Sequence, residues 1–151
     1  MEQKEIIFYI HSSEPMSINL KLIDKLYTNK ENVLFLCENE EEMKKFDLKL
    51  WSYAKTSFIP HCSTCSLDEN IIPYCHTLIS TEIRFDNHPT CLMHNGLNIE
   101  QHENISKFSK IIDVLHQDFG KKERAVFYHQ LGFEQQKSWL RTNNGAWEKA
   151  E

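Results

Sequence analysis

Residues 5–37 read EIIFYIHSSEPMSINLKLIDKLYTNKENVLFLC, and this stretch decides the fold class. The apolar runs at its two ends, 5–10 and 33–37, are short and typical of buried strands. Between them a helix is predicted from about Pro15, because four apolar side chains recur at helical spacing: Met16, Leu20, Ile23 and Tyr27. A strand, a helix and a second strand in this order form the repeating unit of an α/β fold with a parallel sheet.

The rest of the chain continues this alternation. The acidic run 38–42 favours the first turn of a helix, because carboxylates there face unpaired backbone amides. Its inner face carries three apolar side chains: Met43, Phe46 and Leu50. The pattern further along predicts three strands and a helix, near 74–79, 90–93, 110–115 and 120–131. The polar segment 133–147 is assigned no element. We therefore expect one domain over residues 1–151, a three-layer α/β/α arrangement with a largely parallel open sheet and Rossmann-like topology.

Composition narrows the class of protein. Of 151 residues, 40% are hydrophobic and 26% charged, which is ordinary for a globular protein of one domain. The formal net charge of −5 disfavours a general nucleic-acid binder, because affinity for the phosphate backbone comes from clustered Lys and Arg. The apolar runs are too short to cross a bilayer and no signal peptide precedes them, so a cytoplasmic protein without a membrane partner is expected.

The charge is distributed unevenly along the chain. Between His116 and Arg141 lie five basic side chains and three acidic ones, so this segment carries +2 and the remainder −7. The basic residues are Lys121, Lys122, Arg124, Lys137 and Arg141. A small basic zone on an acidic protein favours a short acidic peptide over a long polyanion.

No catalytic motif is recognised in the sequence. Phosphate cradles need glycines that let backbone amides approach the anion, and neither GxGxxG nor GxxxxGK[ST] occurs. The GxSxG motif of serine hydrolases is absent as well. The eight histidines are dispersed without a partner motif, so no acid–base pair can be named. We expect no catalytic residue, no cofactor and no phosphate-binding loop.

The five cysteines leave two alternatives open. Cys62, Cys65, Cys75 and His76 together offer three thiolates and an imidazole, a set that zinc accepts in structural sites. Cys75 and His76 are adjacent, however, and neighbouring side chains on a strand point to opposite faces. We expect free thiols and no metal, with a zinc-dependent interaction module as one alternative. A small α/β enzyme with a cysteine nucleophile is the other.

Several spaced segments resemble the chi subunit family of bacterial DNA polymerase III. In that family a strand ends in Cys-Glu, a helix ends in Leu-Trp, and Ser-Phe-x-Pro-His follows. The corresponding pieces here are VLFLCENEEE (33–42), LW (50–51) and SFIPH (57–61). IFY (7–9) matches the family's first strand, and its last helix and tail are matched by Arg124, Tyr128, Gly132, Phe133 and Trp147. Residues 62–90 match poorly.

The resemblance implies a non-catalytic accessory subunit that links the clamp loader to single-stranded-DNA-binding protein during replication, and so meets nucleic acid only indirectly. One surface would hold the psi subunit or another clamp-loader component, through Trp51, Phe58, Ile59, Pro60 and His61. A Trp and a Phe beside a rigid Pro are low-entropy anchors for a partner. Aromatic residues at the ends of elements also commonly cover a protein's own core, and that alternative stays open.

A second surface, on the resemblance, would receive the C-terminal tail of single-stranded-DNA-binding protein, an acidic peptide with an apolar end. Such a receptor needs a cation and a nearby hydrophobic slot. Lys122, Arg124 and Tyr128 supply that chemistry here. The family more often has Arg at the position of Lys122 and an aromatic residue at that of Ala125, so weaker binding is expected. The alternative is an ordinary solvated basic face.

Overall fold

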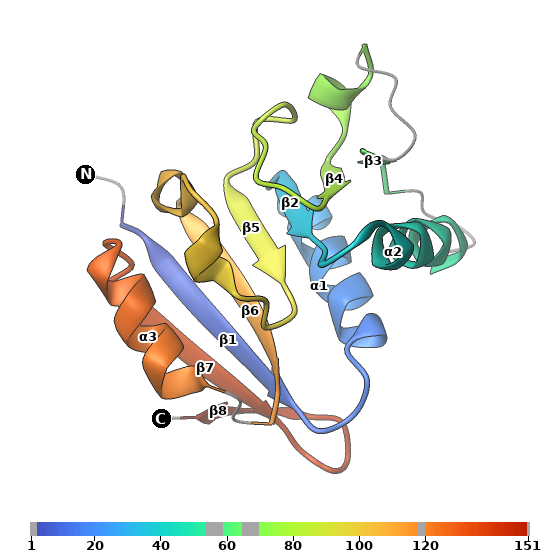
Figure 1. The fold of residues 1–151 in the computed structure, drawn as a ribbon. Coiled ribbons are helices and arrows are strands. Elements are labelled where there is room, and N and C mark those ends of the chain that lie inside the picture. Colours follow the sequence, from blue (N-terminus) through green and yellow to red (C-terminus); the bar gives the residue numbers. More distant parts are fainter. Residues whose placement is uncertain (1–2, 54–58, 65–69, 118–119, 151) are drawn as a thin grey trace.

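The computed structural model describes residues 3–53, 59–64, 70–117 and 120–150, and Figure 1 shows how they are arranged. Eight strands in this part of the chain form one open sheet, in the order β3-β4-β2-β5-β6-β1-β7-β8. The strands are β1 (Glu5–His11), β2 (Val33–Leu36), β3 (His61–Ser63), β4 (Thr77–Ser80), β5 (Cys91–His94), β6 (Lys110–His116), β7 (Gln135–Arg141) and β8 (Trp147–Ala150). The helices are α1 (Met16–Thr28), α2 (Glu40–Tyr53) and α3 (Lys121–Gln130), with 3₁₀ turns η1 (Ile72–Tyr74), η2 (Ile99–Gln101) and η3 (Ile105–Lys107).

The sheet is parallel except at one edge. Strand β1 lies between β6 and β7 and is parallel to both, and β2 is parallel to β4 and β5. Only β8, among the described strands, runs antiparallel to its neighbour β7. The predicted fold class, an α/β protein with a largely parallel open sheet, is confirmed.

The two faces of the sheet bury separate cores. Helices α1 and α2 lie on one face and α3 on the other (Figure 1). On the first face Phe35 of β2 stacks on Phe46 of α2, with ring centroids 4.0 Å apart. On the second, Phe8 of β1 packs against Tyr128 of α3 at 5.9 Å. The alternation of side chains along each strand therefore assigns every second residue to one core.

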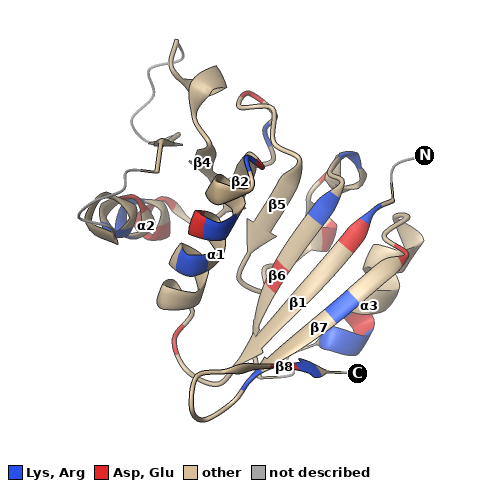
Figure 2. Ribbon diagram, turned by 180° about the vertical axis from the view of Figure 1, so that it is seen from behind, with Lys and Arg blue, Asp and Glu red and all other residues tan. Residues whose placement is uncertain are grey.

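Figure 2 views the sheet from the side of α1, where none of the described helices lies over β1 and β7. Ile7 and Tyr9 on this face of β1 are accordingly only half-buried. The chain end supplies part of the missing cover, because Trp147 of β8 packs edge-on against Tyr9 with ring centroids 5.1 Å apart. None of the three described helices is long and apolar enough to span a membrane.

The structure differs from the sequence-based expectation in several places, and β3 and β8 are strands that the sequence pattern did not predict. The segment 133–147, for which no element was expected, contains β7. The sequence of this strand, QQKSWLR, is mostly polar because the strand pairs with β1 while exposing much of one face. The strand expected near 74–79 begins only at Thr77, since Ile72–Tyr74 forms a 3₁₀ turn with a proline at its start.

Candidate functional site

Two large apolar side chains stand exposed on α2. Leu48 is 67% exposed and Trp51 is 58% exposed, whereas Met43, Phe46 and Leu50 of the same helix are buried in the core. Residues three apart are neighbours on a helix surface, so Leu48 and Trp51 share one face. An exposed apolar pair on the otherwise polar outer face of a helix is a candidate protein-docking surface.

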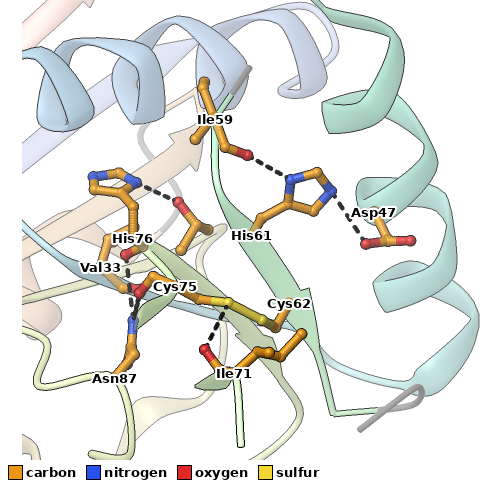
Figure 3. The surroundings of a disulfide bond; sticks show 10 residues. Val33, Asp47, Ile59, His61, Cys62, Ile71, Cys75, His76 and Asn87 are labelled. Atoms are coloured by element: carbon orange, nitrogen blue, oxygen red, sulfur yellow. Dashed lines mark hydrogen bonds and ion pairs between the residues drawn. A yellow bond between two sulfur atoms is a disulfide. The ribbon is translucent and has the colours of Figure 1, made fainter. Parts of the chain in front are cut away.

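His61 connects this exposed face to the interior. Its ring packs against Trp51 at a centroid distance of 4.9 Å, while the residue itself is only 8% exposed. The Nδ1 atom lies 2.7 Å from the carbonyl oxygen of Ile59 and Nε2 lies 3.3 Å from a carboxylate oxygen of Asp47 (Figure 3). The imidazole is held from both sides, and its position supports the Trp51 ring. We name the set Leu48, Trp51 and His61 the α2 surface.

The structure divides the predicted partner-binding residues. It brings the exposed Trp51 against the buried His61, and Pro60, next to His61 in sequence, is half-buried. Ile59 is 2% exposed and belongs to the core. Phe58 lies outside the described residues. Leu48 was missed. Its position three residues before Trp51 indicates that both side chains lie on the same face of the helix.

The cysteines differ from the expectation of free thiols. Cys62 of β3 and Cys75 form a disulfide with their Cα atoms 6.2 Å apart, and Figure 3 shows it beside His61. The parallel pairing of β3 with β4 brings these two positions together, a contact between distant residues that the sequence pattern did not indicate. The side chain of His76 points away from Cys75 and contacts the hydroxyl of Thr77 at 2.7 Å (Figure 3).

Neither cysteine-based alternative gains support from the described residues. Cys37 and Cys91 are both buried, and burial raises the pKa of the Cys91 thiol, which disfavours the thiolate that a nucleophile needs. No group of three metal-ligating side chains is assembled in the part of the chain that the structure describes. Cys65 lies outside that part.

On α3, Arg124 and Tyr128 converge on a buried carboxylate. The Tyr128 hydroxyl donates to an oxygen of Asp113 on β6 at 2.9 Å, and Arg124 donates to the same oxygen at 3.0 Å. His94 at the end of β5 lies 2.9 Å from the Tyr128 hydroxyl through Nε2. Gly96 donates its backbone amide to the other Asp113 oxygen at 3.1 Å. These contacts satisfy a carboxylate that is wholly shielded from solvent.

The same burial shifts the titration of this network. Burial, followed by the nearby charge of Asp113, raises the pKa of Tyr128 well above its ordinary value. Burial lowers the pKa of His94, and the carboxylate of Asp113 opposes this only in part. Tyr128 therefore stays a neutral donor and His94 a neutral imidazole near neutral pH.

Of the three residues predicted to bind the tail, Lys122 is exposed, Arg124 is mostly buried and Tyr128 is completely buried. Tyr128 is completely buried and the Arg124 side chain is 13% exposed, bound to Asp113 and to the carbonyls of Gly96 and Leu97. Lys122 is exposed and lies one turn before Val126, which is 56% exposed. The two form one face of α3.

A shallow cavity of about 560 Å³ continues this face toward the end of α3. Ala125, Val126, His129 and Gln130 line it from the helix, Gln136 of β7 lines it from the sheet, and the acidic Glu134 lines it from the turn before β7. We name Lys122, Val126 and His129 with this cavity the α3 groove. Sequence reasoning noted Ala125 but missed Val126 and His129, whose spacing of four and seven residues from Lys122 indicated the shared face.

Comparison with known protein families gives a match over most of the chain. A family model described as DNA polymerase III chi subunit, HolC, matches residues 3–136. This range contains α1, α2 and α3 and ends at the start of β7. No curated protein matches the chain.

Proposed function

The chain belongs to the chi subunit family of DNA polymerase III, and we propose that it bridges the clamp-loader complex and the C-terminal tail of single-stranded-DNA-binding protein. Membership of this family supports a replication accessory role and points away from catalysis. A bridging protein needs two separate docking surfaces. The observation that carries the proposal is the exposure of Trp51 and Leu48, two large apolar side chains that are not buried in the protein's own core.

The α2 surface is proposed to receive psi or an equivalent clamp-loader component. A half-exposed Trp next to an exposed Leu offers a partner a large apolar area at a small cost in side-chain entropy. His61, held by Ile59 and Asp47, restricts the Trp51 ring before the partner arrives. Preorganisation of this kind favours tight binding because less freedom is lost on association.

The α3 groove is proposed to receive the acidic tail. Lys122 offers a positive charge to a carboxylate, and Val126 with Ala125 offers an apolar contact for the end of the peptide. Arg124 and Tyr128 support this site as positioning residues, since their hydrogen bonds to Asp113 fix α3 against β6. Lysine presents a point charge and not a planar fork, so binding is expected to be moderate.

Fluorescence anisotropy with a labelled acidic peptide ending in an apolar residue tests this assignment. Lys122→Ala should weaken binding about tenfold, because one charge-assisted contact contributes roughly 1.5 kcal/mol or more. Lys122→Arg should restore the affinity of the natural protein or exceed it.

The matched control is Lys25→Ala, which removes one exposed charge from α1 on the opposite side of the sheet. Its affinity for the peptide should equal that of the unaltered protein. Equal weakening by both alanine variants would mean that the peptide senses only overall charge, and the tail assignment would be withdrawn.

A further inference from the structure

A second cavity, of about 430 Å³, lies at the carboxyl ends of β1 and β7, next to the start of α3. His11 and Ile10 line it from β1, Leu140 and Arg141 line it from β7, and Lys121 lines it from the first turn of α3. A volume of this size is in the usual range of small-molecule sites. The cavity shares no lining residue with the α3 groove.

The position of this cavity in the sheet is the one at which open α/β folds bind ligands. β1 is followed by α1 on one face, and the neighbouring β6 is followed by α3 on the other face (Figure 1). The chain therefore leaves two adjacent parallel strands in opposite directions, which opens a crevice at their carboxyl ends. His11 and His116, the last residues of these strands, are register partners with ring centroids 5.5 Å apart.

The polar groups of the cavity suit an anion. His11 is only 3% exposed, and its Nδ1 atom has no hydrogen-bond partner among the described residues. A buried ring nitrogen without a partner is costly unless a ligand or water satisfies it. Lys121 and Arg141 add positive charge, and the first turn of α3, a helix of ten residues, carries no side-chain cap. Amides at such a helix start attract negative charge.

The remaining lining combines apolar side chains with the polar Ser12 and Gln117. Ile10 and Leu140 contribute hydrophobic wall, with Leu140 44% exposed. Glu14 is close enough to act on the charge of His11, but its carboxylate accepts a hydrogen bond from the backbone of Met16 at the start of α1. We propose that this cavity binds a small molecule that carries a carboxylate or phosphate group next to an apolar group.

This site is independent of the proposed function. Lys121 and Lys122 are consecutive on α3 and therefore point about 100° apart around its axis. The first lines the present cavity and the second lies on the α3 groove side. The absence of a glycine-rich loop does not oppose the proposal, because the anion would meet side chains and helix amides in place of a backbone cradle.

NMR titration of the full chain with three matched probes tests the site: phenyl phosphate, phenylacetate and neutral benzyl alcohol. The two anions should shift the signals of His11, Gln117 and Lys121 in a saturable way, and the tighter of them identifies the preferred group. Benzyl alcohol should leave these signals unchanged. Bound anion should also raise the pKa of the His11 imidazole, which burial, His116 and Arg141 lower in the free protein.

Arg141→Ala should weaken the preferred anion about tenfold or more, as expected for loss of one charge-assisted contact. Lys122→Ala should leave the affinity for the anion unchanged while it weakens binding of the tail peptide. The two proposals can therefore be contradicted independently of each other. The proposal is overturned if neither anion shifts the His11 signals, if benzyl alcohol shifts them equally, or if Arg141→Ala binds the anion as the natural protein does.

Discussion

Asp113 is the most enclosed charge of the described residues around α3, and its satisfaction explains why Arg124 and Tyr128 lie inside. Both side chains and the amide of Gly96 donate to its two oxygens, so no lone acceptor is left buried. The residue types at 124 and 128 were recognised in the sequence, but their partner was not. A hydrogen bond between β6 and α3 depends on the tertiary fold, and residue spacing does not show it.

Replacement of Asp113 by Ala should lower the free energy of unfolding by about 3–5 kcal/mol, because it leaves the Arg124 guanidinium enclosed without a counter-charge. Urea denaturation measures the change. The matched control is Asp86→Ala, which removes the carboxylate of the exposed Arg84–Asp86 pair and should cost about 1 kcal/mol or less. Similar losses in both variants would show that the Asp113 network contributes no more than a surface pair.

His94 makes stability depend on pH in a defined direction. Burial lowers its pKa below the ordinary 6.5, so the unfolded chain binds a proton more readily than the folded protein. The contribution of His94 to the free energy of unfolding should therefore be constant above about pH 6.5. Below that pH the free energy of unfolding should fall, and His94 should account for at most about 1.4 kcal/mol per pH unit.

Urea denaturation between pH 5 and pH 8 measures that slope, and His94→Gln should make it smaller. His11 and His76, whose pKa values burial also lowers, keep part of the slope in the variant. An unchanged slope in His94→Gln would remove His94 from this explanation.

The elements differ in how far the sequence predicts them. α1, β1 and β2 follow directly from hydrophobic periodicity, because each places apolar side chains on a core face. β7 and β8 were missed, since strands that expose one face and end at the sheet edge carry few apolar residues. For the candidate sites, Trp51 and Lys122 could be identified from the sequence by their residue types. Leu48 and Val126 could be identified only by working out which residues share the exposed face of each helix.

If the α2 surface binds a partner, different residues of α2 should determine stability and binding. Trp51→Ala should change the free energy of unfolding by about 1 kcal/mol or less while it reduces capture of the psi subunit. The neighbouring Leu50→Ala, at 4% exposure, should cost about 2–5 kcal/mol of stability, because it empties a core position. Urea denaturation and a binding titration with psi measure both. A Trp51→Ala protein as unstable as Leu50→Ala would show that Trp51 serves the protein's own core.

At the scale of the whole molecule, the two proposed docking surfaces lie on opposite faces of the sheet. α2 covers the β2 and β4 half on one face, and α3 covers β1 and β6 on the other (Figure 1). Partners on these surfaces would be kept apart by the sheet itself. The formal net charge of −5 suits a protein that reaches single-stranded DNA through a protein partner and not by its own phosphate contacts.

The most direct measurement of the bridging claim is the affinity of the acidic tail peptide with and without a saturating amount of psi subunit. We expect the same affinity in both conditions, loss of psi alone in Trp51→Ala, and loss of the peptide alone in Lys122→Ala. Release of the peptide by psi, or failure of the unaltered protein to bind either partner, would contradict the claim that two separate surfaces form a bridge.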